Sequence, residues 1–267
     1  MKYQTLKTEI AHGVARVIMN RPEVHNAFDE HLIGELSSEL RHLDHDAEVR
    51  VVVLAASGKS FSAGADLNWM KRMAGYSEAE NLRDAVALAG LMRTLRGMHK
   101  PTLARVQGAA YGGGVGLVAC CDIAVAASDA TFSLSEVRLG LIPSVVSPYV
   151  IAAIGERAAS RFFLTGERFD AVEAKFSGLV HEVVHADKLD DTLGKIIGYL
   201  LQGGPHAVAA AKKLIADMAR RPVDDALMED TARRIAAIRV TAEGKEGINA
   251  FLDKRPPSWV KPKIQTH

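Results

Sequence analysis

The chain has 267 residues, of which 48% are hydrophobic and 24% charged, and its formal net charge is +1. This is an ordinary globular composition, long enough for one large domain and a smaller appendage, and it carries no basic excess for nucleic acid. The only two cysteines, Cys120 and Cys121, are adjacent and fit neither an intrachain disulfide nor a metal-ligand spacing. The N-terminus lacks a secretory signal and no apolar run is long enough for a bilayer, so we expect a soluble, cytoplasmic protein.

Short β-like runs alternate with helical patterns in the first part of the chain, and helical patterns dominate the rest. Strands are predicted over residues 3–10, 14–19, 51–55, 102–106, 123–127, 132–134 and 180–184. Helices are predicted over residues 26–47, 67–73, 77–98, 207–219, 223–238 and 241–252. This order indicates an α/β core over residues 1–200 and a helical C-terminal region over residues 201–267.

The first segment that could form a functional site is residues 60–67, SFSAGADL, which follow the predicted buried strand at 51–55. Small residues let a ligand approach the backbone closely, and Asp66 is placed to cap the short helix that follows. Taken alone, the segment is more typical of a structural strand-to-helix turn than of a ligand site.

The second segment is residues 107–116, QGAAYGGGVG, which follows the strand at 102–106 and opens a helix. Glycines at a helix start expose backbone N–H groups and the positive end of the helix dipole, which suits an anion or a developing oxyanion. Three consecutive glycines cost conformational entropy on folding, so we favour this interpretation over tight packing alone.

The third segment, residues 134–143, LSEVRLGLIP, places Glu136 in a mostly apolar neighbourhood. Partial burial would raise the pKa of this carboxyl towards the range useful for acid/base catalysis. For a single glutamate, an ion pair with Arg138 or a solvated loop is the more usual outcome.

A competing interpretation comes from residues 114–119, GVGLVA, which fit a loose dinucleotide-binding pattern with Glu136 twenty residues beyond Gly116 (136 − 116). That would indicate an NAD-dependent oxidoreductase. However, a helix between the neighbouring strands could cover only residues 114–121, less than the roughly 10–12 residues of a parallel crossover. We therefore rank this interpretation low.

Together the three segments have the order and spacing of the enoyl-CoA hydratase/isomerase (crotonase) family, which the chain resembles over roughly residues 3–259. Asn20-Arg21-Pro22, Asn26-Ala27 and residues 251–255, FLDKR, also match. The resemblance implies a crotonase-like ββα spiral core over residues 1–200, with the CoA-binding and active site. It also implies a helical trimerisation region over residues 201–267, and hence a homotrimer or homohexamer.

The resemblance further implies a division of labour at the site. The backbone N–H groups of Ala65 and Gly113 would bind the thioester oxygen, and Glu136 would act as the acid/base. Losing one such donor typically costs about 10²–10³-fold in rate. The residues implied for CoA binding are Ala63, Asp66 and Leu67 along the adenine and pantetheine path, and Lys59 and Lys254 at the phosphates. No metal or redox cofactor is implied, because CoA enters as part of the substrate.

One position departs from the family pattern. Family hydratases usually carry a second glutamate two residues past the GGG run, where this chain has Gly116. Single-glutamate members include isomerases. Against this, residues 63–70, 116–127 and 134–150 are most similar to bacterial hydratases of branched, carboxylated enoyl-CoAs such as 3-methylglutaconyl-CoA, in leucine and terpenoid breakdown.

We therefore predict an enoyl-CoA hydratase, with a Δ3,Δ2-enoyl-CoA isomerase as the alternative and a non-catalytic acyl-CoA-binding protein as a minority view. Loss of a carboxylate at Gly116 would free volume and relieve repulsion of a substrate that carries its own distal carboxylate. Which group holds the attacking water stays open among Tyr111, Ser144, Ser147 and the substrate itself.

Overall fold

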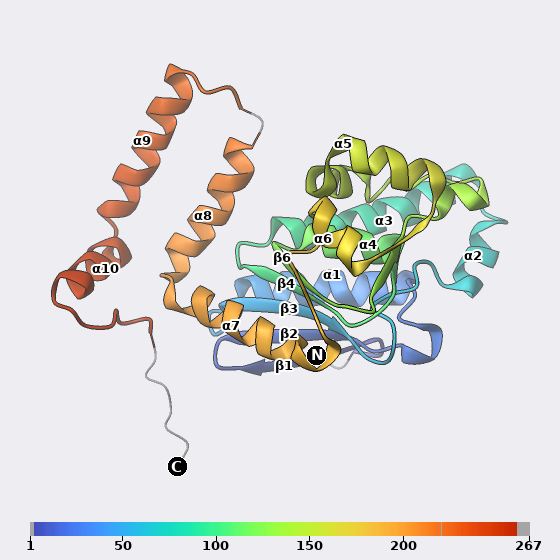
Figure 1. The fold of residues 1–267 in the computed structure, drawn as a ribbon, viewed down its shortest axis with the longest axis horizontal. Coiled ribbons are helices and arrows are strands. Elements are labelled where there is room, and N and C mark those ends of the chain that lie inside the picture. Colours follow the sequence, from blue (N-terminus) through green and yellow to red (C-terminus); the bar gives the residue numbers. More distant parts are fainter. Residues whose placement is uncertain (1–2, 220, 261–267) are drawn as a thin grey trace, which may run out of the picture. The chain divides into compact units, whose positions relative to one another are not determined.

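The computed structural model describes residues 3–219 and 221–260. The chain forms two compact units (Figure 1). The first comprises the described residues up to Met98 together with Thr102–Lys195, and the second comprises His99–Pro101 and the described residues from Ile196 onwards. The division falls within helix α7 (Leu189–Gln202).

A six-stranded sheet in the order β1-β2-β3-β4-β6-β9 runs through the first unit. Its strands are β1 (Leu6–Ala11), β2 (Val14–Met19), β3 (Val51–Ala56), β4 (Thr102–Val106), β6 (Ile123–Ala127) and β9 (Glu182–Val184). The hairpin β1–β2 is antiparallel, and every later pairing is parallel. His12 and Gly13 have φ values of 52° and 82°, as a tight two-residue hairpin turn requires.

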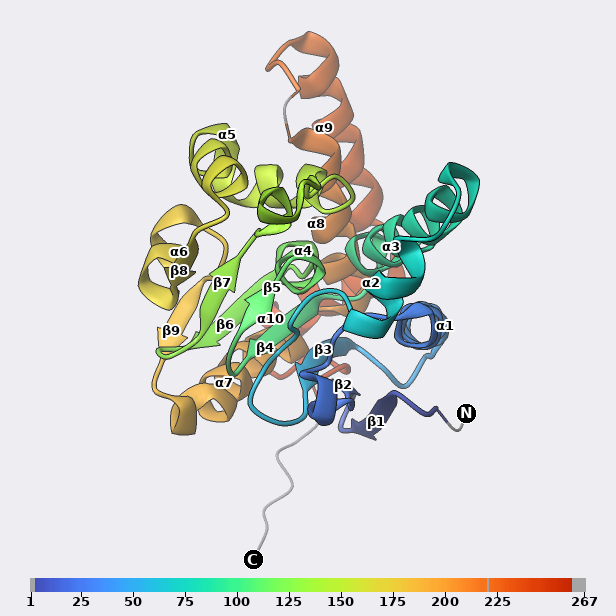
Figure 2. The same ribbon diagram turned by 90° about the vertical axis from the view of Figure 1, so that its right-hand side faces the viewer.

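A smaller sheet joins β5 (Ala110–Tyr111), β7 (Thr131–Ser133) and β8 (Arg168–Asp170). The helices of the first unit are α1 (Glu30–His45), α2 (Leu67–Met73), α3 (Glu78–Gly97), α4 (Gly113–Cys120), α5 (Ser147–Thr165) and α6 (Ala171–Ser177). Helix α4 is buried, and it packs against α3 on one side and α5 on the other (Figure 2). Glu136–Leu139 and two other segments form short 3-10 turns.

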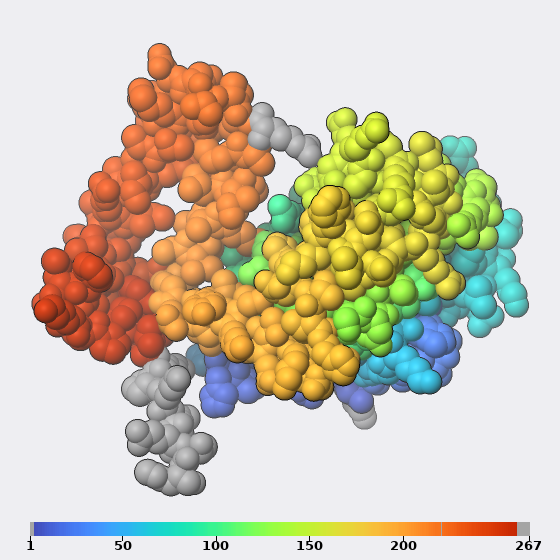
Figure 3. All heavy atoms as spheres, in the orientation of Figure 1, coloured from blue at the N-terminus to red at the C-terminus, as the bar shows by residue number. Residues whose placement is uncertain are grey.

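The second unit contains α8 (Pro205–Met218), α9 (Asp225–Arg239) and α10 (Ala242–Leu252). An ion pair from Arg234 to Asp217 connects α9 with α8, and Arg234 also pairs with Asp230 one turn earlier in α9. Side chains do not fill the space between these two helices on the face seen in Figure 3. Apolar side chains of both helices therefore stay exposed, as Ile215 and Met228 illustrate at 68% and 64%.

The helix predicted over residues 26–47 is shorter than expected at its start. Asp29 is extended and accepts a hydrogen bond from the Leu32 N–H, so helix α1 begins at Glu30. The three residues before Asp29 instead run beside another loop, and Phe28 forms a parallel bridge with Ala65 there. Within residues 3–219 and 221–260, no helix is long and apolar enough to span a membrane.

Helix α3 offers a test of the local signals that define this fold. Ser77 accepts a hydrogen bond from the Glu80 N–H, and the Glu80 carboxylate accepts one of 2.8 Å from the Ser77 N–H. Ser77→Ala should therefore lower the free energy of unfolding by about 0.5–2 kcal/mol, measured by urea titration with circular dichroism.

The matched control is Ser160→Ala within α5. The Ser160 hydroxyl donates to the Glu156 carbonyl of the preceding turn at 2.8 Å and caps no helix. We expect that variant to stay within about 0.5 kcal/mol of the parent. Equal effects of the two substitutions would mean that the capping box does not stabilise α3.

Candidate active site

The loop that precedes α2 and the loop that enters α4 meet backbone to backbone. The Ser62 N–H donates to the Ala109 carbonyl at 3.0 Å, and the Tyr111 N–H donates to the Ser62 carbonyl at 2.9 Å. A β-carbon at Gly114 would lie 2.9 Å from the Ser62 oxygen, closer than ordinary packing allows. Glycine is required there because any side chain would push the two loops apart.

Two backbone donors on these loops are available for a ligand. Phe28 donates to the Gly64 carbonyl at 2.7 Å and accepts from the Asp66 N–H at 2.8 Å, so the Ala65 N–H turns away from this pairing. Gly113 is the first residue of α4, where an N–H has no partner within the helix. Neither N–H group has an acceptor among the residues that the structure describes. The Phe28 ring also supports Gly113, since a β-carbon there would lie 3.0 Å from Cε2 of Phe28.

The Glu136 carboxyl faces the same loops. A β-carbon at Gly112 would lie 3.1 Å from Oε1 of Glu136 and 3.9 Å from the Gly64 Cα. Burial raises the pKa of Glu136, although its own backbone N–H acts in the opposite direction. Oε2 is buried and has no hydrogen-bond partner in the described part of the chain. The predicted ion pair between Glu136 and Arg138 does not form, and no cation of residues 3–219 or 221–260 lowers the pKa of this carboxyl.

Apolar side chains fill the space next to the Cα of Gly116. A β-carbon at Gly116 would overlap Cγ1 of Val146, and it would lie 2.9 Å from Cβ of Val146 and 3.2 Å from Cε of Met92. Both neighbours are buried, with exposed fractions of 3% and 0%. The Val146 side chain therefore occupies the position of a β-carbon at residue 116, so the glycine opens no free volume at that point.

The three hydroxyl groups considered for holding water differ in their partners. The Tyr111 hydroxyl shares a 3.0 Å hydrogen bond with Thr131, and the Ser147 hydroxyl donates to the Ser144 carbonyl at 2.8 Å. The Ser144 side chain is exposed and has no hydrogen-bond partner among the described residues. Of the three, Ser144 alone offers an uncommitted hydroxyl.

The Asp66 carboxylate is buried and already bonded to other residues of the protein. Its carboxylate accepts from the Asn68 and Trp69 N–H groups at 2.8 and 3.2 Å and thereby caps α2, as predicted. Burial acts to raise its pKa, but these N–H groups and the Arg21 guanidinium hold the pKa of Asp66 below its usual value. The predicted CoA contact at this position therefore cannot come from a free carboxylate.

The other residues predicted to bind CoA lie at the surface. Ala63, Ala65 and Leu67 are exposed, whereas the alternate residues of the same loop are buried, so one edge of the loop faces outwards. Lys59 is exposed in the first unit and Lys254 is exposed in the second. Their contacts with CoA stay predictions.

Phe28 and Val146 shape the site but were not singled out from the sequence. Phe28 follows the matched Asn26-Ala27 pair, which is the one local signal that could have found it. Val146 lies ten residues beyond Glu136 (146 − 136) and carries no signal of its own. Each acts through packing against a glycine of α4 that is distant in sequence.

The model of the enoyl-CoA hydratase/isomerase family matches residues 9–262. A crotonyl-CoA hydratase of Syntrophomonas wolfei is 32% identical, over 97% of this chain and 99% of its own. A hydroxycinnamoyl-CoA hydratase-lyase of Pseudomonas fluorescens is 32% identical, over 100% of this chain and 97% of its own. The solved structure of an enoyl-CoA hydratase from Shewanella pealeana is 45% identical, with a TM-score of 0.94 and coverage of 97% of each chain. The predicted crotonase-like α/β fold is thereby confirmed.

The packing at Gly116 can be tested by one methyl group. Gly116→Ala forces its β-carbon into Val146, and such overpacking costs about 1–3 kcal/mol. Gly90→Ala within α3 is the matched control, because a β-carbon there meets nothing within 4 Å. The control should gain up to about 1 kcal/mol from helix propensity.

Both variants are measured by urea unfolding, and Val146→Ala added to Gly116→Ala should recover part of the loss. If Gly116→Ala is as stable as Gly90→Ala, the space beside Val146 can accept a side chain at residue 116.

Proposed function

Because the chain belongs to the enoyl-CoA hydratase/isomerase family, we propose that it is a hydratase that adds water to a 2-enoyl-CoA thioester through an enolate. One observation carries the proposal: an unneutralised, half-buried carboxyl at Glu136 faces two glycine-rich loops that leave the Ala65 and Gly113 N–H groups unpaired among the described residues. The names of the Syntrophomonas and Shewanella relatives support the reaction class.

In the proposed reaction the thioester oxygen accepts hydrogen bonds from Ala65 and Gly113. These donors stabilise the negative charge that develops on that oxygen, and each contributes about 10²–10³-fold in rate. The Glu136 carboxylate takes a proton from water as the water oxygen bonds to C3. The resulting carboxylic acid then gives a proton to C2, so the water is divided between C3 and C2 and Glu136 returns to its starting form.

A single carboxyl also suits the second candidate, a Δ3,Δ2-enoyl-CoA isomerase. That reaction moves one proton between C4 and C2 and requires no activated water. The observation that favours it is that residue 116 is a glycine surrounded by the hydrocarbon of Val146 and Met92, so this position supplies no second carboxylate. The non-catalytic alternative is less well supported because Glu136 is retained.

The finer proposal for the substrate is a branched, carboxylated enoyl-CoA such as 3-methylglutaconyl-CoA. It rests on the similarity of residues 63–70, 116–127 and 134–150 to hydratases of such substrates. Packing at Gly116 gives it no support, since the volume there is occupied by Val146. CoA is part of the substrate in every version of the proposal.

For the assembly we propose a homotrimer or a dimer of trimers, following the resemblance. The apolar side chains exposed in the second unit support burial against another surface. They include Tyr199, Ile215, Val223, Met228, Val240 and Phe251, with exposed fractions from 64% to 94%. An isolated chain would leave this surface in contact with water, which is unfavourable for so many large apolar groups.

Glu136→Gln should lower turnover by about 10²–10⁴-fold, because an amide cannot exchange the proton. The variant should also unfold at a higher temperature than the parent at pH 8. The raised pKa means that the fold disfavours the ionised form, so ionisation of Glu136 lowers stability as the pH rises through its folded pKa. At pH 4, below the unfolded pKa of about 4.3, the two melting temperatures should converge.

Glu167→Gln is the control with the opposite sign. Hydrogen bonding to Arg161 lowers the pKa of Glu167, so this carboxylate stabilises the fold above its unfolded pKa and loses that effect as the pH falls. The control should keep full turnover and melt no higher than the parent at pH 8. Normal turnover in Glu136→Gln would exclude Glu136 as the acid/base.

The proposed activity is tested with the purified protein in a paired assay. Absorbance of the conjugated thioester should fall as crotonyl-CoA or 3-methylglutaconyl-CoA is hydrated, and it should rise if a 3-enoyl-CoA is isomerised. Faster hydration of the branched acid supports the finer proposal, and preference for crotonyl-CoA rejects it. Isomerisation without hydration would establish the second candidate, and CoA-ester binding without either reaction would establish the non-catalytic one.

A further inference from the structure

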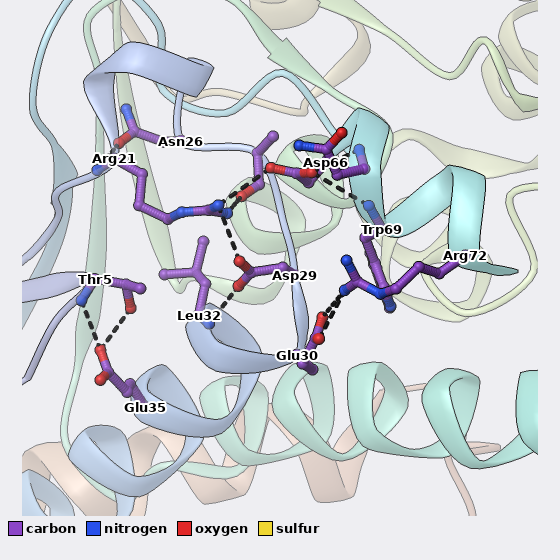
Figure 4. A network of polar contacts seen from close by, with 12 residues as sticks. Thr5, Arg21, Asn26, Asp29, Glu30, Leu32, Glu35, Asp66, Trp69 and Arg72 are labelled. Carbon is purple, nitrogen blue, oxygen red and sulfur yellow. Dashed lines mark hydrogen bonds and ion pairs between the residues drawn. The ribbon is translucent and has the colours of Figure 1, made fainter.

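Arg21, whose side chain is largely shielded from solvent, lies behind the proposed oxyanion site. Arg21 Nη1 donates to the Ala27 carbonyl at 2.6 Å. Its Nη2 lies 2.9 Å from Oδ2 of Asp29 and 3.1 Å from Oδ2 of Asp66. The guanidinium therefore lies between two carboxylates (Figure 4). The three side chains are only 16%, 13% and 7% exposed, so these contacts are largely removed from solvent screening.

Both carboxylates also cap helices. Oδ1 of Asp29 accepts from the Leu32 N–H at 2.8 Å at the start of α1, and Oδ1 of Asp66 accepts from Asn68 at the start of α2. Each carboxylate thus uses one oxygen for its helix and the other for Arg21. One guanidinium thereby connects the N-termini of two helices.

The same guanidinium contacts residues on both strands of the backbone pairing between Phe28 and the segment around Ala65. Ala27 and Asp29 flank Phe28, and Asp66 directly follows Ala65. The Phe28 backbone pairs with the residues on either side of Ala65, and its ring lies against Gly113. A shift of this pairing would therefore move the Ala65 N–H and loosen the support of Gly113.

We propose that Arg21 is a positioning residue, which holds the Ala65 N–H in place for the thioester oxygen through its contacts with Ala27, Asp29 and Asp66. The proposal rests on the function proposed above. Arg21 acts through the backbone and reaches no reacting atom. Lysine cannot replace it, because a single ammonium group lacks the planar fork that serves three oxygens in fixed directions.

The test uses Arg21→Lys, which keeps the positive charge. We expect kcat to fall by about 10–10²-fold, approaching the loss of one oxyanion donor, while KM changes less than threefold. The matched control is Arg72→Lys. Arg72 on α2 pairs with Glu30 at 2.7 Å, but the two side chains are 45% and 49% exposed. The control should keep its kcat.

A spectroscopic measurement separates positioning from a purely structural role. Cinnamoyl-CoA is bound to Glu136→Gln, which prevents turnover, and the red shift of its absorbance reports polarisation of the thioester carbonyl. Adding Arg21→Lys should reduce this shift by at least half with little change in binding. Asp66→Asn, which keeps an oxygen for the α2 cap but loses the ion pair, should reduce the shift similarly and replaces Arg21→Lys if that variant does not fold.

The outcomes are distinct. A full red shift with Arg21→Lys or Asp66→Asn, or an equal loss with Arg72→Lys, would overturn the positioning role and leave the proposed function standing. Absence of any red shift in Glu136→Gln alone would overturn the oxyanion site itself, and the positioning role with it.

Discussion

The close approach of two loop backbones is the constraint on which the site depends. The Ser62 oxygen comes so near Gly114 that no β-carbon fits between them, and hydrogen bonds at Ala109 and Tyr111 lock the loops together. Because main chain rather than side chain fills this contact, the groups left over for a ligand are backbone N–H donors. A site of this kind is encoded in the sequence as small residues rather than as reactive ones.

The charged groups near the proposed site differ in whether an opposite charge lies beside them. Arg21 is matched by Asp29 and Asp66, and every charged group of that set also makes a hydrogen bond to backbone. Glu136 has no cationic partner in the described part of the chain, and burial raises its pKa. A compensated set gives a fixed geometry, whereas an uncompensated carboxyl is free to gain and lose a proton. The former supports the backbone donors, and the latter supplies the chemistry.

Features set by neighbours in sequence were predictable. The capping box at Ser77 and the Asp66 cap of α2 depend on residues three positions away or fewer, and both were correctly identified. Features set by distant neighbours were not. Asn26 was assigned to a helix, but its side chain donates to the Ser57 and Ser60 carbonyls in a loop more than thirty residues away. The two-residue strand β5 and the three-residue strand β8 are too short to show a period.

The hydrocarbon at Gly116 has a consequence for the chemistry. The Gly116 N–H donates to the Gly112 carbonyl, so a side chain at 116 would project from the same face of α4 as Gly112, which adjoins Glu136. A glutamate at residue 116 would repel the ionised form of Glu136, and the two carboxyls would then titrate as a coupled pair with two separate pKa values. With Val146 in that space, the pKa of Glu136 is raised by burial and not by a second carboxylate at this position. Hydration by this chain would therefore pass both the proton taken from water and the proton given to carbon through one carboxyl.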